Sequence, residues 1–257
     1  MKAYSGLARV YDYLLTGVNY EEWADYLEQL FKYFNVEPRQ SIVDLACGTG
    51  NSTLPWAERG YDVCGVDISE EMLSVARDKA KTRSLPARFF QQDLCQLRLP
   101  LQADVAVLYQ DGLNYLLTTA ALRKAFLSLY KCMRPGGFFI FNLNMVEMLP
   151  IGQTPQVSFL DEPEMTLLWE SAYTGEERIW SIHLIAFLRE KGGYYSKIEE
   201  EHRERSHSRG ELENLFAETG WHLRACFKAF TLEEPAPQER NIFYIIQRDD
   251  MQREAIS

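Results

Sequence analysis

A short apolar run that ends in an acid and two closely spaced glycines constrains the fold of this chain more than any other feature. The run reads SIVDLACGTGN at positions 41–51, and the residues from Asn51 to Gly60 favour a short helix. This order predicts a strand, a tight turn and a helix, which is how an α/β fold opens a nucleotide site at a strand end. Gly48 and Gly50 would let the backbone approach a ligand where a Cβ atom would block it.

The downstream sequence repeats the pattern of a strand that ends in an acid. The run YDVCGVD ends at Asp67, FFQQD ends at Asp93, and DVAVLY at 104–109 predicts a fourth strand. The turn RPGG at 134–137 then precedes FFIFNL at 138–143, which predicts a fifth strand. An acid about twenty residues past the glycine turn is placed to accept hydrogen bonds from ribose hydroxyls. A glycine turn followed by strands that end in acids therefore predicts a nucleotide-containing ligand.

Taken together, these motifs resemble those of the class I S-adenosylmethionine (SAM) methyltransferases, with VDLACGTG at 43–50 as motif I. The resemblance is close over residues 4–144 and looser towards the C-terminus. The opening YSGLARVYD at 4–12 and YEEW at 20–23 are similar to the small-molecule branch, which includes sugar-amine and glycine-type N-methyltransferases. The resemblance implies SAM as the cofactor and S-adenosylhomocysteine as its product. No metal is expected, because no spacing of His, Cys, Asp and Glu resembles a closed metal site.

Two other classes of protein remain open at this point. A nucleotide-dependent oxidoreductase would use a third glycine three residues after the second, to pack its helix under a pyrophosphate. Thr53 occupies that position here, which favours SAM over a nicotinamide dinucleotide. A SAM-binding regulatory module without catalysis would keep the cofactor motifs and lack an acceptor pocket.

The expected fold is α/β: a Rossmann-like seven-stranded, mostly parallel sheet with helices on both faces, plus a small antiparallel β insert after the fifth strand. Residues 1–150 would form the SAM-binding core with an N-terminal lid. Residues 151–207 would form the insert, either as a cover over the active site or as a dimer interface. Residues 208–257 would return to the core, with the last strand between the fifth and sixth. Extended runs separated by Thr174-Gly175 and Gly192-Gly193 predict the insert.

The resemblance also implies which residues contact the cofactor. Asp67 would bind the ribose hydroxyls, and Asp93 the adenine amino group. Asp44 would either hold the glycine loop or serve as a buried structural acid, and Tyr11 would belong to a lid over the methionine part. The full expected cofactor set is Tyr11, Asp44, Ala46, Gly48, Gly50, Asp67, Ile68, Met72, Asp93, Leu94, Tyr109 and Gln110.

The acceptor side is less determined by the sequence. An amine acceptor need only be neutral and aligned, whereas an oxygen or carbon acceptor needs a general base. No catalytic residue is assigned, and the candidate bases are Tyr11, Asp111, His183 and His202. His183 lies in an apolar strand, which is typical of a core histidine, and the charged run at 197–207 is expected to be mostly a solvated face. The expected substrate contacts are Asn114, Tyr115, His202 and Arg205.

Composition limits the partners. The net charge of -10 over 257 residues argues against nucleic acid and against an anionic membrane surface. The five cysteines form no C-x-x-C pair, which predicts reduced thiols and, without a signal peptide, a cytoplasmic protein. The predicted function is methyl transfer to a small-molecule acceptor, with a mild preference for an amine nitrogen, by a monomer or homodimer.

Overall fold

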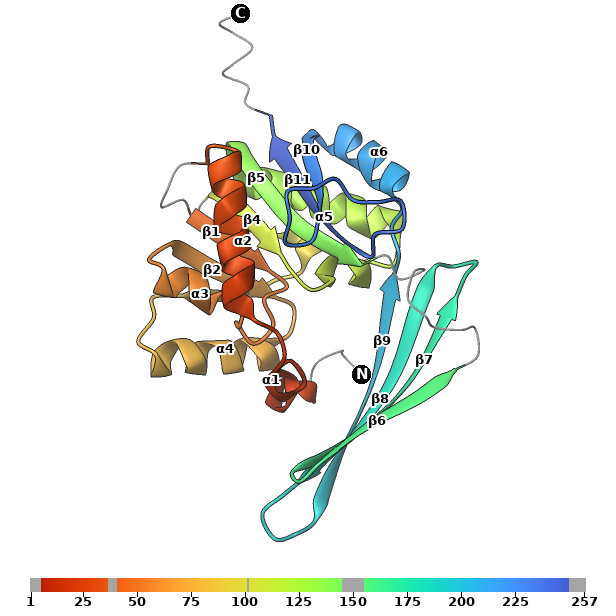
Figure 1. Cartoon of the computed structure of the whole chain (residues 1–257). Helices are drawn as coiled ribbons and strands as arrows, with labels where there is room; N and C mark the ends of the chain where they lie inside the picture. The colour runs from red at the N-terminus through yellow and green to blue at the C-terminus, as the bar shows by residue number, and fades with distance from the viewer. Residues whose placement is uncertain (1–5, 37–40, 101, 145–154, 250–257) are drawn as a thin grey trace, which may run out of the picture.

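The structure, a computed structural model, describes residues 6–36, 41–100, 102–144 and 155–249. Its core is a seven-stranded sheet in the order β10-β11-β5-β4-β1-β2-β3 (Figure 1). Neighbouring strands from β5 to β3 pair in parallel, and β11 pairs antiparallel with both β5 and β10. The Rossmann-like prediction is confirmed, including the last strand inserted beside the fifth. The strands are β1 (Ser41–Leu45), β2 (Asp62–Asp67), β3 (Arg88–Gln91), β4 (Ala103–Leu108), β5 (Met133–Asn144), β10 (Trp221–Lys228) and β11 (Asn241–Arg248).

Helices cover both faces of this sheet, and side-chain oxygens fix where the longer ones begin. The oxygens of Asn19, Ser69, Thr118 and Ser208 each accept a backbone N–H at a helix start. One face packs against α2 (Tyr20–Tyr33) and α3 (Leu54–Glu58), with α4 (Glu70–Thr82) beside them. The other face packs against α5 (Thr119–Cys132) and α6 (Arg209–Thr219).

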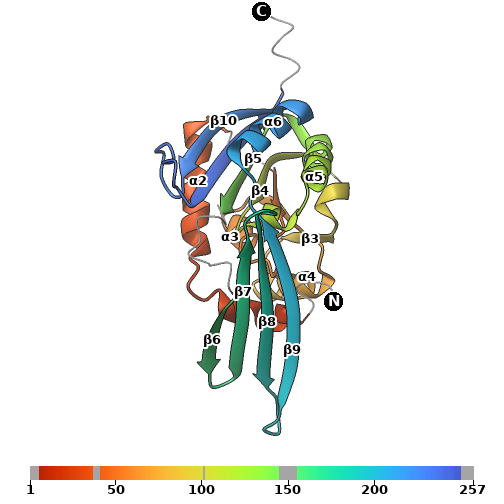
Figure 2. The same ribbon diagram turned by 90° about the vertical axis from the view of Figure 1, so that its right-hand side faces the viewer.

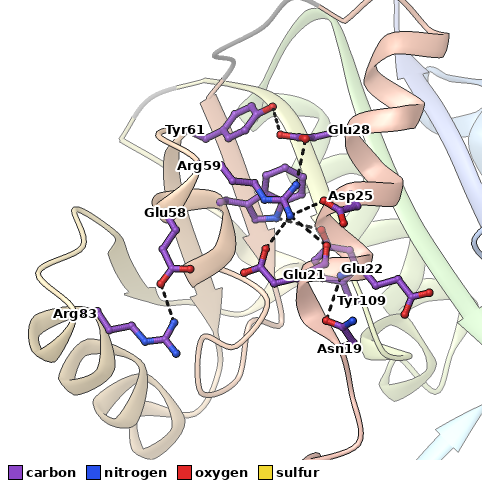
Figure 3. Close-up of polar contacts among 11 residues, drawn as sticks. Asn19, Glu21, Glu22, Asp25, Glu28, Glu58, Arg59, Tyr61, Arg83 and Tyr109 are labelled. Atoms are coloured by element: carbon purple, nitrogen blue, oxygen red, sulfur yellow. Dashed lines mark hydrogen bonds and ion pairs between the residues drawn. The ribbon is translucent and has the colours of Figure 1, made fainter.

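One arginine joins α2 to α3 on the sheet face (Figure 3). The Arg59 guanidinium lies 2.8 Å from Glu21, 2.7 Å from Asp25 and 3.1 Å from Glu28. These acids are three or four residues apart, so they share one side of α2. The opposite side of α2 faces the core, where Trp23 packs edge-on against Tyr109 at 5.1 Å between ring centroids. We call Arg59 and these three acids the α2–α3 clamp. By holding α2 in place, the clamp supports Tyr109, which follows β4.

A separate four-stranded antiparallel sheet follows β5, as expected, and extends away from the core as a narrow ribbon (Figure 2). Its strands are β6 (Gln156–Glu162), β7 (Met165–Thr174), β8 (Ile179–Arg189) and β9 (Tyr195–Arg205). The N-terminal elements η1 (Leu7–Arg9) and α1 (Tyr11–Leu14) pack on this sheet through Leu7, Val10 and Leu14. The elements η1 and α1 thus lie between the insert and the core.

One local expectation differs from the structure, and another concerns residues that the structure does not describe. The RPGG segment is part of β5, which already begins at Met133 opposite Ala103 and carries a register shift before Phe138. Gly136 has a φ of 76°, so a bulge replaces the expected turn. Residues 145–150, expected at the end of the core, and 151–154, at the start of the insert, lie outside the described residues. No helix in the described part of the chain has the length and apolar character that crossing a bilayer requires.

Candidate functional site

A cavity of about 420 Å³ lies beyond the carboxyl ends of β1, β2, β3 and β4. β1 pairs with β2 on one side and with β4 on the other, so the chain reverses its strand order here. Ligands of open α/β sheets bind at such a point. All of the expected cofactor residues except Asp44 and Gly50 line the cavity: Tyr11, Ala46, Gly48, Asp67, Ile68, Met72, Asp93, Leu94, Tyr109 and Gln110.

The glycine turn and the acid at the end of β2 are bonded to each other. The Gly48 N–H donates to Asp67 Oδ2 at 2.8 Å, and the Ser69 N–H donates to Asp67 Oδ1 at 2.8 Å. Burial raises the pKa of the Asp67 carboxyl, while these N–H groups act in the opposite direction. A carboxylate has about four lone-pair sites, so Asp67 keeps acceptor capacity for a ligand beside the N–H groups of Gly48, Ile68 and Ser69. Gly50 has a φ of 79°, and a Cβ there would lie 2.9 Å from Ala76, so a side chain would push α4 off the turn.

Asp44 lies behind the turn rather than in the cavity. It is fully buried and accepts hydrogen bonds from Ser52 Oγ at 2.7 Å and Thr53 Oγ1 at 2.5 Å. Burial raises its pKa to about 7. Thr53, the position where a dinucleotide fold would use glycine, therefore ties the start of α3 to β1. Asp44 Oδ1 is buried without a hydrogen-bond partner among the described residues.

The N-terminal segment is bonded to the glycine turn through a residue that the sequence reasoning did not select. The Asp12 carboxylate accepts from Thr49 Oγ1 and from Asn51 Nδ2, and it pairs with Lys79 of α4. Its place beside Tyr11 in the YSGLARVYD run was the available signal. Tyr20, which also lines the cavity, donates from its hydroxyl to Gln110 Oε1 at 2.9 Å. These contacts place α1 and Tyr20 over the cavity.

The loop after β4 has an unusual backbone at the cavity wall. Gln110 and Asp111 have φ values of 50° and 64°, in the left-handed region that side chains disfavour. Asn142 of β5 stabilises this shape, because its Oδ1 accepts from the Gln110 N–H at 2.8 Å. The loop leads into η3 (Gly112–Tyr115), and Gly112 and Tyr115 line the cavity while Asp111 and Asn114 do not.

The charged run of β9 is not mostly solvated, which corrects the expectation. Glu200, His202 and Glu204 are buried, with exposed fractions of 2%, 5% and 7%. They alternate along the strand, so they share the face that packs against η1 and η3. Tyr115 Oη lies 3.3 Å from His202 Nδ1, and His202 Nε2 lies 3.3 Å from Glu200 Oε2. Glu199, on the opposite face, pairs instead with Lys197.

The remaining candidates lie away from the cavity. Both terminal nitrogens of Arg205 donate to the Glu211 carboxylate, at 2.8 and 3.2 Å. Asn114 is fully buried and donates to the Arg205 carbonyl at 2.9 Å, which joins η3 to the end of β9. The expectation of a core histidine at 183 is wrong. His183 is 37% exposed and lies 2.9 Å from Glu199, because it faces the outer side of the sheet.

Comparisons with known proteins agree with this geometry. A family model that describes a methyltransferase domain matches residues 42–137. YqeM of Bacillus subtilis (strain 168), which carries a methyltransferase name without a stated acceptor, is 32% identical over 248 residues, covering 95% of this chain and 97% of that protein. A crystal structure of a SAM-dependent methyltransferase from Clostridium acetobutylicum ATCC 824 superposes with a TM-score of 0.83 at 25% identity, covering 96% of this chain and 100% of the other.

A more distant relative has an acceptor in its name. The dTDP-3-amino-3,4,6-trideoxy-alpha-D-glucopyranose N,N-dimethyltransferase of Streptomyces venezuelae is 31% identical over 135 residues, which is 52% of this chain and 55% of that protein. The motifs, the fold and the full-length relatives together define the class: the chain belongs to the class I SAM-dependent methyltransferases.

The residues around the cavity fit SAM. Asp67 presents free lone pairs at the end of β2, and Asp93 and Leu94 lie where β3 ends. The Asp44 Oδ1 atom, which has no partner among the described residues, is buried behind the glycine turn and is not part of the cavity lining. Asp67 and Asp93 match the ribose and the adenine in chemical type, and the cavity has the size of a small cofactor site.

Proposed function

We propose that this protein transfers a methyl group from SAM to the nitrogen of a small-molecule amine. The choice of an amine as the acceptor rests on the charge of the residues that line the cavity. Among the residues that the structure describes, those that line the cavity include Asp67, Glu71 and Asp93 and no lysine or arginine. An anionic acceptor such as a carboxylate or a phosphate ester would meet repulsion there without a compensating cation. The amino-sugar N,N-dimethyltransferase relative supports the same acceptor chemistry.

Four groups of residues would divide the work. Asp67 and Asp93 bind and orient the cofactor, and Asp12 holds the N-terminal segment over the glycine turn. When bound, SAM supplies a methyl group activated by a sulfonium. Tyr11, Tyr20 and Tyr109 line the cavity, where their aromatic rings would exclude water and would suit a cation. The antiparallel sheet would close the acceptor side, as a cover over the strand ends.

Calorimetric titration with SAM, S-adenosylhomocysteine and NADH, followed by a panel of acceptors, tests this function. We expect binding of the two sulfur compounds alone. The purified protein with SAM is then incubated with primary and secondary amines and with matched alcohols and carboxylic acids, and the products are read by mass spectrometry. We expect a mass gain of one methyl group on amines. Methylation of the alcohols or acids in place of the amines would contradict the proposal, and cofactor binding without transfer would favour a regulatory module.

A further inference from the structure

A buried polar cluster on the inner face of the antiparallel sheet adjoins the cofactor cavity. We call Tyr115, Glu200, His202 and Glu204 the β9 cluster. Its three β9 members are at least nine-tenths buried. Ionisable side chains are costly to bury, so a chain of them beside a cavity is more typical of a functional site than of a structural core.

Tyr115 connects the cluster to the cavity. Its side chain lines the cavity wall, and its hydroxyl lies 3.3 Å from His202 Nδ1. It also forms a hydrogen bond with the Glu204 carboxyl. A molecule bound next to Tyr115 is therefore separated from the His202 imidazole and from the Glu204 carboxyl only by the Tyr115 side chain.

Trp180 supplies an independent sign of a ligand. It lies opposite Glu204 in the register of β8 and β9, so the two side chains share one face of the sheet. Its indole Nε1 is buried and has no hydrogen-bond partner among the described residues. Buried donors without partners are rare in folded proteins. An indole ring beside a carboxyl is also a favourable pair for an ammonium group, through its ring face and through charge.

The charges that act on Glu204 also favour a cationic ligand. Burial and the negative charge of Asp111 both raise the pKa of Glu204, to about 8, although the hydrogen bond from Tyr115 opposes them. The nearby Arg205 does not compensate, because its guanidinium is bound by Glu211. A cation that enters beside Tyr115 would stabilise the ionised form of Glu204.

We propose that the β9 cluster is the acceptor site, and that it takes a protonated primary or secondary amine, with Glu204 as its counter-ion and His202, reached through Tyr115, as the group that removes its proton. This inference rests on the proposed function and specifies the acceptor's charge and the residues that recognise it.

The proton transfer balances with the groups present. Once the ammonium pairs with the Glu204 carboxylate, the Tyr115 hydroxyl turns its single proton from that carboxyl to His202 Nδ1, 3.3 Å away. The ammonium N–H then donates to Tyr115 Oη, and its proton replaces the hydroxyl proton as that proton passes to His202 Nδ1. The resulting imidazolium is stabilised by Glu200 Oε2, 3.3 Å from Nε2. The amine nitrogen then has a free lone pair, which forms the N–C bond as the C–S bond breaks and its electron pair goes to sulfur. The proton lost by nitrogen resides on His202 and leaves after the product.

Glu200 links this chain to the N-terminal segment. Its second oxygen, Oε1, accepts from the backbone N–H groups of Gly6 at 2.7 Å and Leu7 at 3.1 Å. A Cβ at Gly6 would lie 2.5 Å from Ile198 Cγ2, so only glycine allows this close approach. The segment that carries Tyr11 and Asp12 to the cofactor side is therefore fixed by the residue that supports His202.

The test uses charge-matched probes on the full chain saturated with S-adenosylhomocysteine. Benzylammonium, benzyl alcohol and benzoate share an aromatic body that suits the tyrosine-lined cavity, and they differ in charge. We expect benzylammonium to bind at least about tenfold more tightly than either of the others at neutral pH, as measured by calorimetry or NMR titration. Glu204→Gln should remove this preference. Glu199→Gln, a matched change on the exposed face of the same strand, should keep it.

The outcomes separate this inference from the proposed function. Failure of S-adenosylhomocysteine to bind would contradict the cofactor assignment. Normal cofactor binding with equal affinity for benzyl alcohol, with preference for benzoate, or with no binding of any probe would overturn the acceptor site. Retention of the preference in Glu204→Gln would overturn the counter-ion. The wild-type comparison stands if that variant does not fold. Trp180→Phe, which keeps an aromatic ring and removes the N–H, provides a second variant that is expected to weaken benzylammonium binding.

Discussion

The ends of the parallel strands and the inner face of β9 hold their charges in different ways. At the strand ends the backbone does so, because Asp67 accepts from two backbone N–H groups at 2.8 Å each. On β9 the side chains hold one another, with His202 between Tyr115 and Glu200. Backbone donors are present whatever the side chains are, whereas a side-chain network changes with a single substitution. The first arrangement suits a constant cofactor, and the second suits an acceptor that differs between relatives.

The largest effect should follow from a substitution at the strand ends, where the cofactor is expected to bind. Asp67→Ala removes the two oxygens that we propose as acceptors for the ribose, and it leaves the Gly48 N–H without its partner. We expect SAM affinity to fall by about 100-fold or more, equivalent to about 3 kcal/mol, while the fold is retained. Calorimetric titration measures the affinity, and circular dichroism checks the fold. Asp62→Ala, at the exposed start of the same strand, is the control. Wild-type affinity in Asp67→Ala would remove Asp67 from the site.

Breaking the β9 cluster should leave cofactor binding unchanged and slow the chemistry. His202→Gln keeps a polar side chain but cannot accept and hold the acceptor's proton. We expect kcat to fall by about 100-fold with the amine that the acceptor panel identifies, and SAM affinity to stay within about twofold. The kcat loss should shrink as pH rises, because more of the amine arrives already neutral.

His183→Gln provides the matched control, since this histidine faces the outer side of the same sheet. An equal kcat loss in both variants would show a general effect on the sheet. A loss confined to KM in His202→Gln would assign His202 to binding rather than to proton removal.

The pH dependence of stability provides a second test of the β9 cluster, through Glu204. Its pKa is raised to about 8 by burial and by Asp111, against the hydrogen bond from Tyr115, so the folded state holds the proton more tightly than the unfolded chain. The stability that this protonation contributes is fully present below the unfolded pKa of about 4.5 and is lost as pH rises to about 8.

Glu204→Gln avoids that loss, so it should be more stable than wild type by about 1–3 kcal/mol near pH 8–9 and by little near pH 5. Thermal unfolding across this range measures the difference, with Glu199→Gln on the exposed face expected to show no such rise. A Glu204→Gln variant that is less stable at every pH would show that the carboxylate is already compensated without a ligand.

Sequence reasoning succeeded for residues whose position is set by the strand next to them in the sequence. It failed for residues whose burial or pairing depends on segments far away in the sequence. Gly48, Asp67 and Asp93 lie at or just beyond the carboxyl ends of β1, β2 and β3. The carboxyl ends of parallel strands meet at one edge of a sheet, so their shared cavity could be predicted. The β9 run has few apolar residues, and its burial comes from η1 and η3, which lie far away in the sequence. Arg205 has the chemistry of a substrate contact, but Glu211 binds it, and the spacing alone does not reveal that competition.

The smallest effect should come from the clamp between α2 and α3, which tests whether the cofactor side depends on its backbone alone. Arg59→Met keeps much of the side-chain stem and removes ion pairs to Glu21, Asp25 and Glu28, which are themselves partly exposed. We expect a loss of about 1 kcal/mol in unfolding free energy and SAM affinity within about twofold of wild type. Chemical denaturation and calorimetry measure the two quantities. A large loss of SAM affinity with little loss of stability would show that α2, through Trp23 and Tyr109, shapes the cavity. The cofactor side would then depend on side-chain contacts as the β9 cluster does.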